Sequence, residues 1–232
     1  MTKPVVIVVD GIISVGKSTY IEMLSIQLQK RGWKVTIVKE PVEKWNSCGI
    51  LQRFYADPGR WAYHFQTKAF HDRVVENIEM FEKFGATSDV FILERSPFTD
   101  TLFMEMLHEA GHVDALEMEH YREWWKLWIR VMPYKPDLFI YLKAGIDKCM
   151  DRVRQRNREG EEGVSKTYQE ALQAKHDSFF GYTGQIDISG NDVPHNVPCQ
   201  ILIVDDDFRN DQHIQDMLTL HFEDLIKSVS RS

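Results

Sequence analysis

Residues 11–18 read GIISVGKS and constrain this chain more than any other feature, because they fit the phosphate-binding loop pattern G-x-x-x-x-G-K-[ST]. The apolar run at 5–9 predicts a buried strand before the loop, and residues 19–31 are predicted to form a helix after it. In that setting the backbone N–H groups of the loop surround a phosphate. Chance would produce the pattern in about one chain in a hundred of this length. We therefore expect the chain to bind a nucleoside triphosphate.

Polar side chains of this loop have separate expected roles. Lys17 places a positive charge near the β- and γ-phosphate oxygens, and the Ser18 hydroxyl is placed to bind Mg²⁺. The expected ligand is ATP or another nucleoside triphosphate together with Mg²⁺. The predicted nucleotide-binding residues of the loop are Gly11, Ser14, Gly16, Lys17, Ser18 and Thr19.

Length and composition favour a single α/β domain spanning residues 1–232, with 43% hydrophobic residues available for a core. The formal net charge of −7 argues against general affinity for nucleic acids or membrane surfaces, so a site for phosphates must be locally basic. Cys48, Cys149 and Cys199 are widely spaced, which indicates reduced thiols rather than metal ligands.

The sequence also carries expectations about location. No apolar stretch approaches the ~20 residues that a membrane-spanning helix needs. The first predicted strand begins so close to Met1 that no targeting segment would fit before it. We therefore expect a cytoplasmic protein, with a nuclear location as the alternative, and no membrane or nucleic-acid partner.

Five apolar runs alternate with predicted helices, which is typical of a parallel sheet with helices on both faces. Residues 181–198 are rich in Gly, Pro, Asn and Asp and are predicted to form an exposed loop. The expected fold is a phosphate-loop kinase with a five-stranded parallel sheet. The predicted strands are 5–9, 35–38, 90–93, 138–142 and 201–204.

Three further helices are predicted at 60–84, 114–131 and 147–159. Trp124 and Trp128 lie four residues apart in the second of them and share a face. That spacing predicts packing against the core, and a contact between two copies of the chain is the alternative.

Charged residues directly follow two of the predicted strands. Glu40 comes after the strand 35–38, and Glu94 and Arg95 come after the strand 90–93. Because the carboxyl ends of parallel strands meet at one edge of a sheet, these side chains are expected to flank the bound phosphates. In phosphoryl transfer to an alcohol, a carboxylate orients the hydroxyl and accepts its proton while cations spread the charge. A lone glutamate at a strand end is usually only solvated, so the prediction depends on the shared sheet edge.

Arginines at 152, 154, 156 and 158 follow in a predicted helix, on which Arg152 and Arg156 share a face and Arg154 points elsewhere. The acidic turn EGEEG comes next, so the segment from about 152 to 165 is predicted to be a lid that closes cations over the transferring phosphates. Arginine suits this role because its planar guanidinium binds two phosphate oxygens at once.

With these motifs assembled, the chain resembles the deoxynucleoside kinase family over nearly its whole length. The resemblance implies ATP-dependent phosphorylation of the 5′-hydroxyl of a deoxynucleoside, in nucleotide salvage, by a homodimer. The motifs, in the order of the family, are E-P-V-x-x-W at 40–45, Tyr55 followed by P-G-R-W at 58–61, F-Q-T at 65–67, E-R-S at 94–96, the lid arginines Arg152, Arg156 and Arg158, and D-D-F at 206–208.

On the acceptor side, the resemblance implies that Glu40 is the base for the 5′-hydroxyl, that Trp45 lines the nucleobase pocket and that Tyr55 bonds the 3′-hydroxyl. It also implies that Phe65 stacks on the nucleobase and that Gln66 bonds its edge. The amide of Gln66 suits that role on chemical grounds, since it offers one donor and one acceptor. By residue type alone, Phe65 and Tyr55 would be interpreted as packing residues.

On the donor side, the resemblance implies that Glu94 lies near Mg²⁺ and that Arg95 lies near the reacting oxygens. It places Asp207 and Phe208 in the loop around the adenine of the donor.

The carboxylate of the lid that contacts the sugar is open between two residues. Glu161 fits if the spacing from Arg152 is kept without a gap, and Glu162 fits if paired glutamates are matched. We take Glu161, because no gap is then needed. Two other features depart from the family pattern, namely the Pro97-Phe98 pair and the longer 181–198 loop.

Arg73 and Asp100 stand at positions that help to set base preference in the family, and the small Ala69 lies between Gln66 and Arg73. An Arg–Asp pair there is similar to the deoxycytidine and deoxyguanosine kinases. Such charges can meet exocyclic amino and carbonyl groups, which the methyl group of thymine cannot satisfy. We therefore expect deoxycytidine and purine deoxynucleosides to be preferred over thymidine.

Two other functions fit part of the pattern. A deoxynucleoside monophosphate kinase of the thymidylate kinase type shares the fold and an E-P turn, but it needs cations where Glu40 stands, and the segment after Pro41 lacks the expected glycines. A non-catalytic nucleotide-binding subunit would be expected to have lost Lys17, Glu40 or Arg95, and all three are present. A GTPase is disfavoured because no N/T-K-x-D motif occurs.

Overall fold

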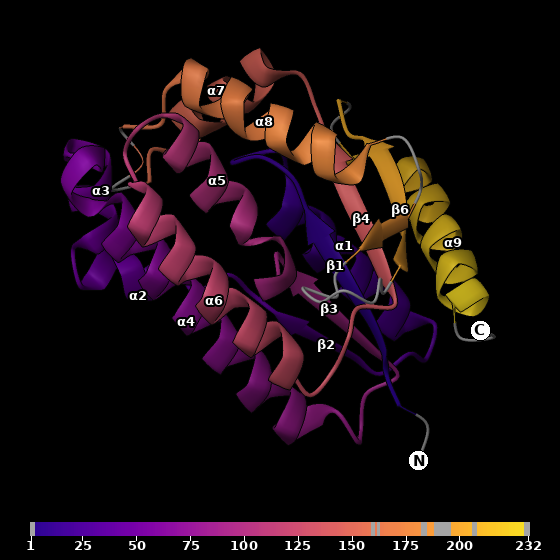
Figure 1. Ribbon diagram of the computed structural model, residues 1–232. Coiled ribbons are helices and arrows are strands. Elements are labelled where there is room, and N and C mark those ends of the chain that lie inside the picture. Colours follow the sequence, from indigo (N-terminus) through magenta and orange to yellow (C-terminus); the bar gives the residue numbers. More distant parts are fainter. Residues whose placement is uncertain are drawn as a thin grey trace.

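A six-stranded sheet lies at the centre of the residues that the structure describes (Figure 1). Its strands are β1 (Val5–Asp10), β2 (Val35–Val38), β3 (Val90–Glu94), β4 (Leu138–Lys143), β5 (Gln185–Asp187) and β6 (Asn196–Ile203). The order is β2-β3-β1-β4-β6-β5, and all neighbours are parallel except β5, which is antiparallel to β6. The computed structural model describes residues 3–158, 161, 163–181, 185–187, 196–205 and 208–229.

The burial of the central strand β1 explains why its sequence is a continuous apolar run. Its residues from Val6 to Val9 are fully buried, because strands pair on both sides and helices cover both faces. Such strands are continuous apolar runs in parallel sheets. The register places Val8 beside Leu93 of β3 and Phe139 of β4. The predicted five-stranded parallel sheet is confirmed.

The end of the sheet differs from the prediction. The last parallel strand begins at Asn196 rather than at 201, and β5 adds an antiparallel edge strand within the segment predicted as a loop. Residues 182–184 and 188–195 of that segment lie outside the described part. Exposed and half-buried residues interrupt β6, because it lies near the sheet edge, so no unbroken apolar run marked its start.

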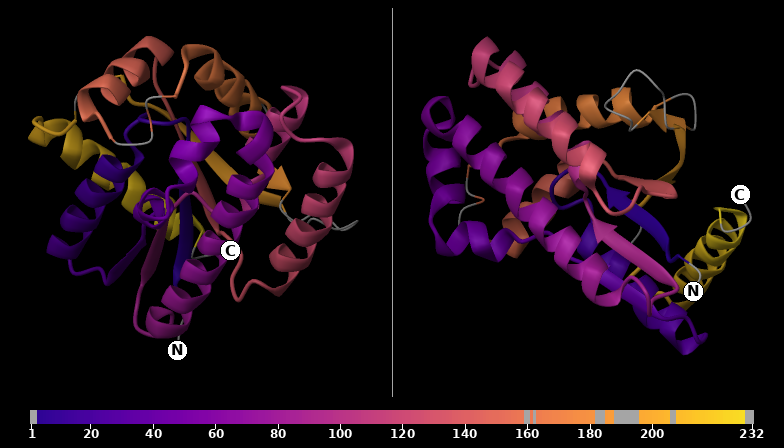
Figure 2. Two further views of the ribbon diagram at one scale, coloured as in Figure 1. Left: turned by 90° about the vertical axis from the view of Figure 1, so that its left-hand side faces the viewer. Right: turned by 60° about the horizontal axis from the view of Figure 1, so that its bottom comes forward.

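Helices cover the sheet in two layers (Figure 2). Right-handed crossovers require α1 and α4 to lie on opposite faces, since the chain moves outward from β1 to β2 and back from β2 to β3. α9 packs on α1, whereas α5 contacts α4, α6 and α8 on the other face. The helices are α1 (Lys17–Lys30), α2 (Val42–Ser47), α3 (Ile50–Ala56), α4 (Pro58–Phe84), α5 (Thr101–Glu109), α6 (Ala115–Val131), α7 (Ile146–Arg156), α8 (Lys166–Phe180) and α9 (Gln212–Val229), with a short 3₁₀ turn at Pro97–Thr99.

Capping residues set the helix boundaries. Asp57 caps α4, with its side chain accepting from the Arg60 N–H, and Pro58 occupies the first turn, so this helix begins two residues before the predicted start. The predicted helix 147–159 is wrong at its end. α7 stops at Arg156 because Asn157 adopts a left-handed conformation with φ 42°, and Arg158 therefore follows the helix.

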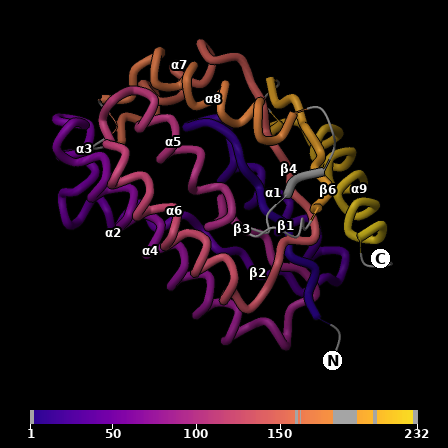
Figure 3. The backbone as a smooth tube through the Cα atoms, in the orientation of Figure 1, coloured from indigo at the N-terminus to yellow at the C-terminus, as the bar shows by residue number. Residues whose placement is uncertain are grey.

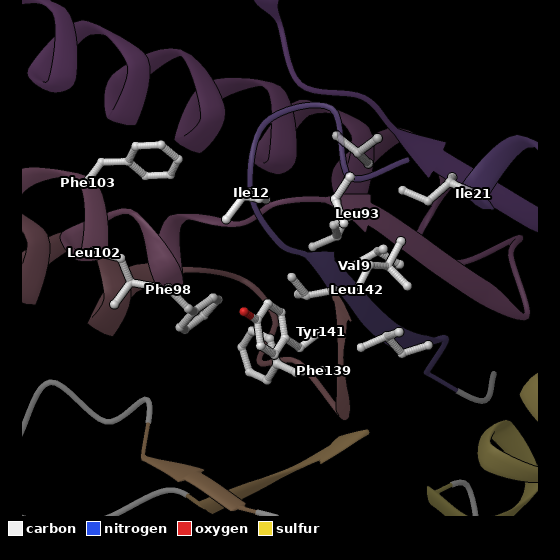
Figure 4. Close-up of a cluster of buried hydrophobic side chains, with 14 of the residues drawn as sticks. Val9, Ile12, Ile21, Leu93, Phe98, Leu102, Phe103, Phe139, Tyr141 and Leu142 are labelled. Atoms are coloured by element: carbon white, nitrogen blue, oxygen red, sulfur yellow. The ribbon is translucent and has the colours of Figure 1, made fainter. Parts of the chain in front are cut away.

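The core fills the space between the sheet and the helix layers on both of its faces. Phe139 and Tyr141 of β4 lie together with Phe98 of the 3₁₀ turn, as the close-up in Figure 4 shows. In α6 the predicted packing holds for Trp128, which lies partly buried against this core beside Trp125. It is wrong for Trp124, which is 49% exposed. Among the described residues, no helix is both long enough and apolar enough to span a membrane.

Gly11 joins the central strand to the phosphate loop under a tight steric limit. Its φ is 141°, and a Cβ built on it would lie 2.4 Å from the carbonyl oxygen of Leu142 on the neighbouring strand. Only a residue without a side chain fits this approach.

Gly11→Ala is therefore expected to reduce the free energy of unfolding by about 3 kcal/mol or more, through backbone strain and overpacking together. Gly32→Ala is the matched control, since Gly32 has φ 90° but no atom within 4 Å of the added Cβ, and it should cost only about 1 kcal/mol. Urea unfolding of both variants measures the difference. Equal losses would mean that the contact with Leu142 is unimportant.

Candidate active site

A cavity of about 820 Å³ opens at the carboxyl ends of the parallel strands. The phosphate loop, the segments after β2 and β3, the helix α4 and the segment from α7 to Glu161 all contribute to its wall. Four predicted site residues do not line it, namely Gly11, Ala69, Asp100 and Phe208, and Asp207 lies outside the described residues. The predicted residues that do line it are Ser14, Gly16, Lys17, Ser18, Thr19, Glu40, Trp45, Tyr55, Phe65, Gln66, Arg73, Glu94, Arg95, Arg152, Arg156, Arg158 and Glu161.

Lys17 lies at the phosphate-loop end of the cavity. Its ammonium group donates to the carbonyl oxygens of Gly11 (3.1 Å) and Ile12 (2.9 Å). Burial, with the charge of Arg95 adding to it, lowers the pKa of Lys17 to about 8, although nearby carboxylates oppose the shift. A triphosphate would supply the negative charge that this buried ammonium lacks.

The hydroxyl of Ser18 donates to Oε1 of Glu94 over 2.6 Å, so the two predicted metal ligands are in direct contact. Their oxygen atoms are the type of ligand that Mg²⁺ prefers, and Mg²⁺ usually takes only one or two protein ligands besides phosphate and water. The residues present therefore fit this ion. No group of three or more His, Cys, Asp or Glu residues in the described part of the chain is placed to hold a metal by itself.

Glu40 lies between two arginines at the centre of the cavity. Its Oε1 accepts from Nη2 of Arg73 (2.6 Å) and lies 3.4 Å from Nε of Arg95. Burial alone would raise the pKa of Glu40, but the charges of Arg95, Arg73 and Lys17 outweigh it, and the pKa lies below its ordinary value. Glu40 is consequently an ionised carboxylate that can accept a hydrogen bond from an incoming hydroxyl.

Arg95 forms an ion pair with Asp10, the last residue of β1. Nη1 of Arg95 donates to Oδ1 of Asp10 over 2.8 Å, and the same oxygen accepts from the Gly11 N–H over 2.7 Å. Nε2 of His176 lies 3.2 Å from this oxygen, and the ring of Phe103 lies 4.7 Å below the Arg95 guanidinium. Burial alone would raise the pKa of Asp10, but His176 and Arg95 keep it far below its ordinary range. Arg95 itself has φ 61°.

Aromatic rings form the far end of the cavity. Phe65 is stacked on Phe54 at 4.8 Å on one side, and Trp45 meets it edge-on at 5.5 Å. The indole N–H of Trp45 donates to Asp72 over 3.0 Å, which fixes the ring. Nε2 of Gln66 is buried and has no hydrogen-bond partner among the described residues. A flat ligand with a polar edge would supply both the stacking surface and the missing acceptor.

Arg73 and Asp100 form a buried ion pair behind this pocket. Nη1 of Arg73 donates to Oδ1 of Asp100, and the Arg73 guanidinium lies 5.1 Å from the Trp45 ring. Ala69, which is only 1% exposed, lies one turn before Arg73 on the same side of α4. Burial raises the pKa of Asp100 to about 6, with Glu40 adding to the shift and Arg73 opposing it.

The described residues at and after the end of α7, Arg156, Arg158 and Glu161, contribute to the wall of the cavity. Glu161 is 7% exposed and forms ion pairs with Arg156 and, at 3.3 Å, with Arg158. Gly163 lies against the side chain of Tyr55, where a Cβ would approach the tyrosine Cβ to 2.5 Å. Glu162 lies outside the described residues, so the structure describes only one of the two alternatives for the lid carboxylate.

Two further contacts reach the phosphate loop and the helix α1 that follows it, one from Arg152 and one from Phe208. Nη1 of Arg152 donates to the carbonyl oxygen of Val15 over 2.8 Å, whereas Arg154 pairs with Asp151 on the exposed face, as its helical position predicts. Phe208 is 5% exposed, and its ring meets that of Tyr20 edge-on at 6.0 Å.

Comparison with known proteins agrees with this geometry. A family model described as deoxynucleoside kinase matches residues 7–227. The chain belongs to the deoxynucleoside kinase family. It is 34% identical to a probable deoxycytidine kinase of Fowlpox virus (strain NVSL), over 95% of this chain and 88% of that protein. It is 30% identical to deoxycytidine kinase 2 of Gallus gallus (90% and 86% covered) and to the mitochondrial deoxyguanosine kinase of Xenopus laevis (90% and 85%).

The family confirms the resemblance inferred from the motifs. The chain is an ATP-dependent deoxynucleoside kinase, a phosphotransferase of nucleotide salvage, and its fold is that of a phosphate-loop kinase. The roles of the individual residues, the metal ion, the base preference and the oligomeric state are separate questions.

Sequence reasoning missed several residues that support this kinase site. Asp10 directly precedes Gly11, and a carboxylate at the end of a predicted strand could have been recognised as a candidate site residue. Gln169 and His176 are fully buried polar residues of α8, and Tyr168 lines the cavity, but no motif marked them. Asp72, the partner of the Trp45 indole, was also unmarked.

The buried pair of Arg73 and Asp100 makes the stability of this kinase depend on pH. Because the folded-state pKa of Asp100 is raised to about 6, the folded protein favours the protonated carboxyl. The wild type should therefore lose stability relative to Asp100→Asn as pH rises from 4.5 to 7.5, by about 2 kcal/mol. Arg73 keeps Glu40 as a partner in the variant. Urea unfolding of both proteins at the two pH values tests this, and a difference independent of pH would count against a protonated Asp100.

Proposed function

We propose that the cavity holds a deoxynucleoside and a nucleoside triphosphate with their reacting ends meeting at Glu40. The observation that carries this proposal is the place of Glu40 itself. It lies between Arg73, which reaches toward the aromatic pocket, and Arg95, which is anchored beside the phosphate loop. An acceptor hydroxyl at Glu40 would thus face a γ-phosphate on the loop. We propose that residues 1–232 act as one kinase domain with a lid at about 152–165.

In this proposal Glu40 orients the 5′-hydroxyl of the nucleoside and accepts its proton. A carboxylate with a lowered pKa is a weak base, but the loose transition state of phosphoryl transfer requires little base strength and depends on positioning. Arg95 holds the migrating phosphoryl group, because its other side is fixed by Asp10. These two groups place the hydroxyl and the phosphorus in line.

On the donor side, Lys17 and the backbone of the loop hold the β- and γ-phosphates. Ser18 and Glu94 hold Mg²⁺, which neutralises charge on the phosphate oxygens when it is bound. Arg152, Arg156 and Arg158 supply further cations. Phe208, with Asp207, is proposed to border the adenine of the donor, and ATP is the proposed donor.

On the acceptor side, Trp45, Phe65 and Gln66 hold the nucleobase, and Tyr55 with Glu161 contacts the 3′-hydroxyl. The unpaired amide nitrogen of Gln66 supports a hydrogen bond to the base edge.

Base preference follows from Arg73 and Asp100. Nε of Arg73 and Oδ2 of Asp100 are buried without a hydrogen-bond partner in the described part of the chain. Arg73 lines the cavity and can meet a polar group of a base directly, whereas Asp100 lies behind it and acts by holding the Arg73 guanidinium. Thymine presents a methyl group that cannot satisfy the guanidinium. We propose that deoxycytidine and purine deoxynucleosides are preferred over thymidine, and the names of the relatives, deoxycytidine and deoxyguanosine kinases, support this.

Initial rates with ATP and Mg²⁺ across the four deoxynucleosides, dTMP and dCMP test the substrate class. We expect turnover of the nucleosides, with kcat/KM for deoxycytidine or a purine deoxynucleoside at least about tenfold above that for thymidine. Equal or better kcat/KM for thymidine would refute the base preference. Turnover confined to dTMP and dCMP would indicate a monophosphate kinase and remove the proposed role of Glu40.

Substitution of Glu40 tests its role as base. Glu40→Gln keeps the size of the side chain but cannot accept the proton, so we expect kcat to fall by about 10²-fold or more. Dissociation constants for an ATP analogue should change by less than about threefold, because Glu40 does not contact the donor in this proposal. Glu79→Gln, an exposed residue of α4 outside the cavity, is the matched control. An unchanged kcat in Glu40→Gln would exclude the assigned role.

We also propose that the chain forms a homodimer through the outer face of α6. Leu116, Trp124, Leu127 and Val131 recur at helical spacing on that face and are 75%, 49%, 56% and 54% exposed. Apolar residues grouped in this way usually mark an interface. A cytoplasmic location is proposed as well, supported by three cysteines that form no disulfide with one another.

Leu127→Glu places a charge on this face and should convert the dimer to a monomer in sedimentation equilibrium, since a buried unpaired carboxylate is costly. Met217→Glu, on the exposed face of α9, is the control and should leave the mass unchanged. A wild type that sediments as a monomer would refute the interface.

A further inference from the structure

Helix α8 contacts the phosphate loop through one fully buried side chain, Gln169. Its Oε1 accepts from the N–H of Ile13 over 3.1 Å, and its Nε2 donates to the carbonyl oxygen of Ile13 over 2.7 Å. Both polar groups of the Gln169 amide therefore bond the backbone of a single residue, Ile13, which lies 156 positions earlier in the sequence. The loop between β1 and α1 can be followed beside α8 in Figure 3. No motif that predicted the site includes Gln169.

The phosphate loop has a backbone that needs such support. Gly11, Ser14 and Gly16 all have positive φ, at 141°, 61° and 116°. For Ser14, which carries a side chain, this conformation costs about 1 kcal/mol or more. Lys17 bonds two carbonyl groups of the loop, but a triphosphate would attract that ammonium toward its own oxygens. The two bonds from Gln169 do not depend on Lys17.

The direction of the Ile13 carbonyl matters for anion binding. In a trans peptide the C=O and the following N–H point in opposite directions, and the described residues contain no cis peptide. Fixing the Ile13 carbonyl toward Gln169 therefore points the Ser14 N–H away from α8. If this peptide turned over, a carbonyl oxygen rather than an N–H donor would take its place, and a carbonyl repels phosphate oxygens.

Helix α8 is itself well anchored. Gln169, Leu172 and His176 form a fully buried stripe at helical spacing, and Phe180 continues it. His176 lies 3.2 Å from Asp10, the last residue of β1, so α8 also contacts the strand end from which the loop starts. The helix begins directly after the lid segment, with Ser165 as its cap. Helix α8, which follows the proposed lid segment, thus fixes Ile13 of the loop, and Arg152 of α7 adds a bond to Val15.

We propose that Gln169 is a positioning residue that holds the phosphate loop in its donor-binding conformation. The inference rests on the proposed role of this loop as the donor site. Without the amide, the loop also populates conformations in which the Ile13–Ser14 peptide is turned over. The apparent dissociation constant for the donor then equals the intrinsic one divided by the fraction of molecules whose loop can still bind. The nucleoside pocket, built on α4 and the segment after β2, is left unchanged.

Gln169→Met tests the proposal, because methionine has a similar length and favours helix but forms neither hydrogen bond. Calorimetric titration with a non-hydrolysable ATP analogue and Mg²⁺ should show a dissociation constant raised about tenfold, the effect of one or two lost hydrogen bonds. The KM for ATP should rise in parallel, and the KM for the deoxynucleoside should change by less than about twofold. Gln173→Met, one turn further along α8, is the matched control and should bind the analogue as the wild type does.

Three results would overturn the proposal. They are unchanged analogue binding in folded Gln169→Met, an equal rise in both KM values, and the same loss of binding in Gln173→Met. If Gln169→Met does not fold, Gln169→Glu replaces it, because its carboxylate still accepts from the Ile13 N–H but cannot donate to the carbonyl, and weakened donor binding is again expected. A wild type that binds the analogue without phosphorylating nucleosides would instead refute the proposed function, which separates the two failures.

Discussion

A series of ion pairs, in which carboxylates and guanidinium groups alternate, runs through the site, and the relative positions of the other site residues depend on it. Asp10 pairs with Arg95, Arg95 lies beside Glu40, Glu40 accepts from Arg73, and Arg73 pairs with Asp100. The five residues come from the ends of three strands, from α4 and from the start of α5. Because an uncompensated buried charge is costly, each member requires its neighbours, and the strands and helices that carry them are held in one relative position.

The same series of ion pairs lies between the two ends of the cavity, one of which is cationic and the other apolar. At one end Lys17 and the loop provide cations and N–H groups, and at the other Phe65 and Trp45 provide apolar surface. Glu40 stands between them, with cations on both sides. The overall charge of −7 is no obstacle to phosphate binding, because Arg152, Arg156 and Arg158 gather locally around the cavity. A kinase for a neutral acceptor and an anionic donor requires this division.

Support for the phosphate loop comes from outside the motif that defines it. Gln169 bonds the backbone of Ile13, His176 lies beside Asp10, and Arg152 bonds the carbonyl of Val15. Two of these side chains belong to α8 and one to α7, the helices that come before and after the acidic turn of the proposed lid. The loop is therefore held by contacts from both of these helices.

The sequence by itself determined the parallel sheet, the phosphate loop and most of the cavity wall. Buried strands such as β1 are unbroken apolar runs, and chemical motifs such as E-R-S are local in sequence, so both can be recognised without a fold. Only the tertiary structure decided that Asp10 anchors Arg95, that Gln169 holds Ile13 and that Asp72 holds the Trp45 indole. Such partners are buried polar residues separated by up to 156 positions, with no periodicity or spacing to mark them. The edge strands β5 and β6 were misjudged for a related reason, since a half-exposed strand lacks the continuous apolar pattern that burial on both faces produces.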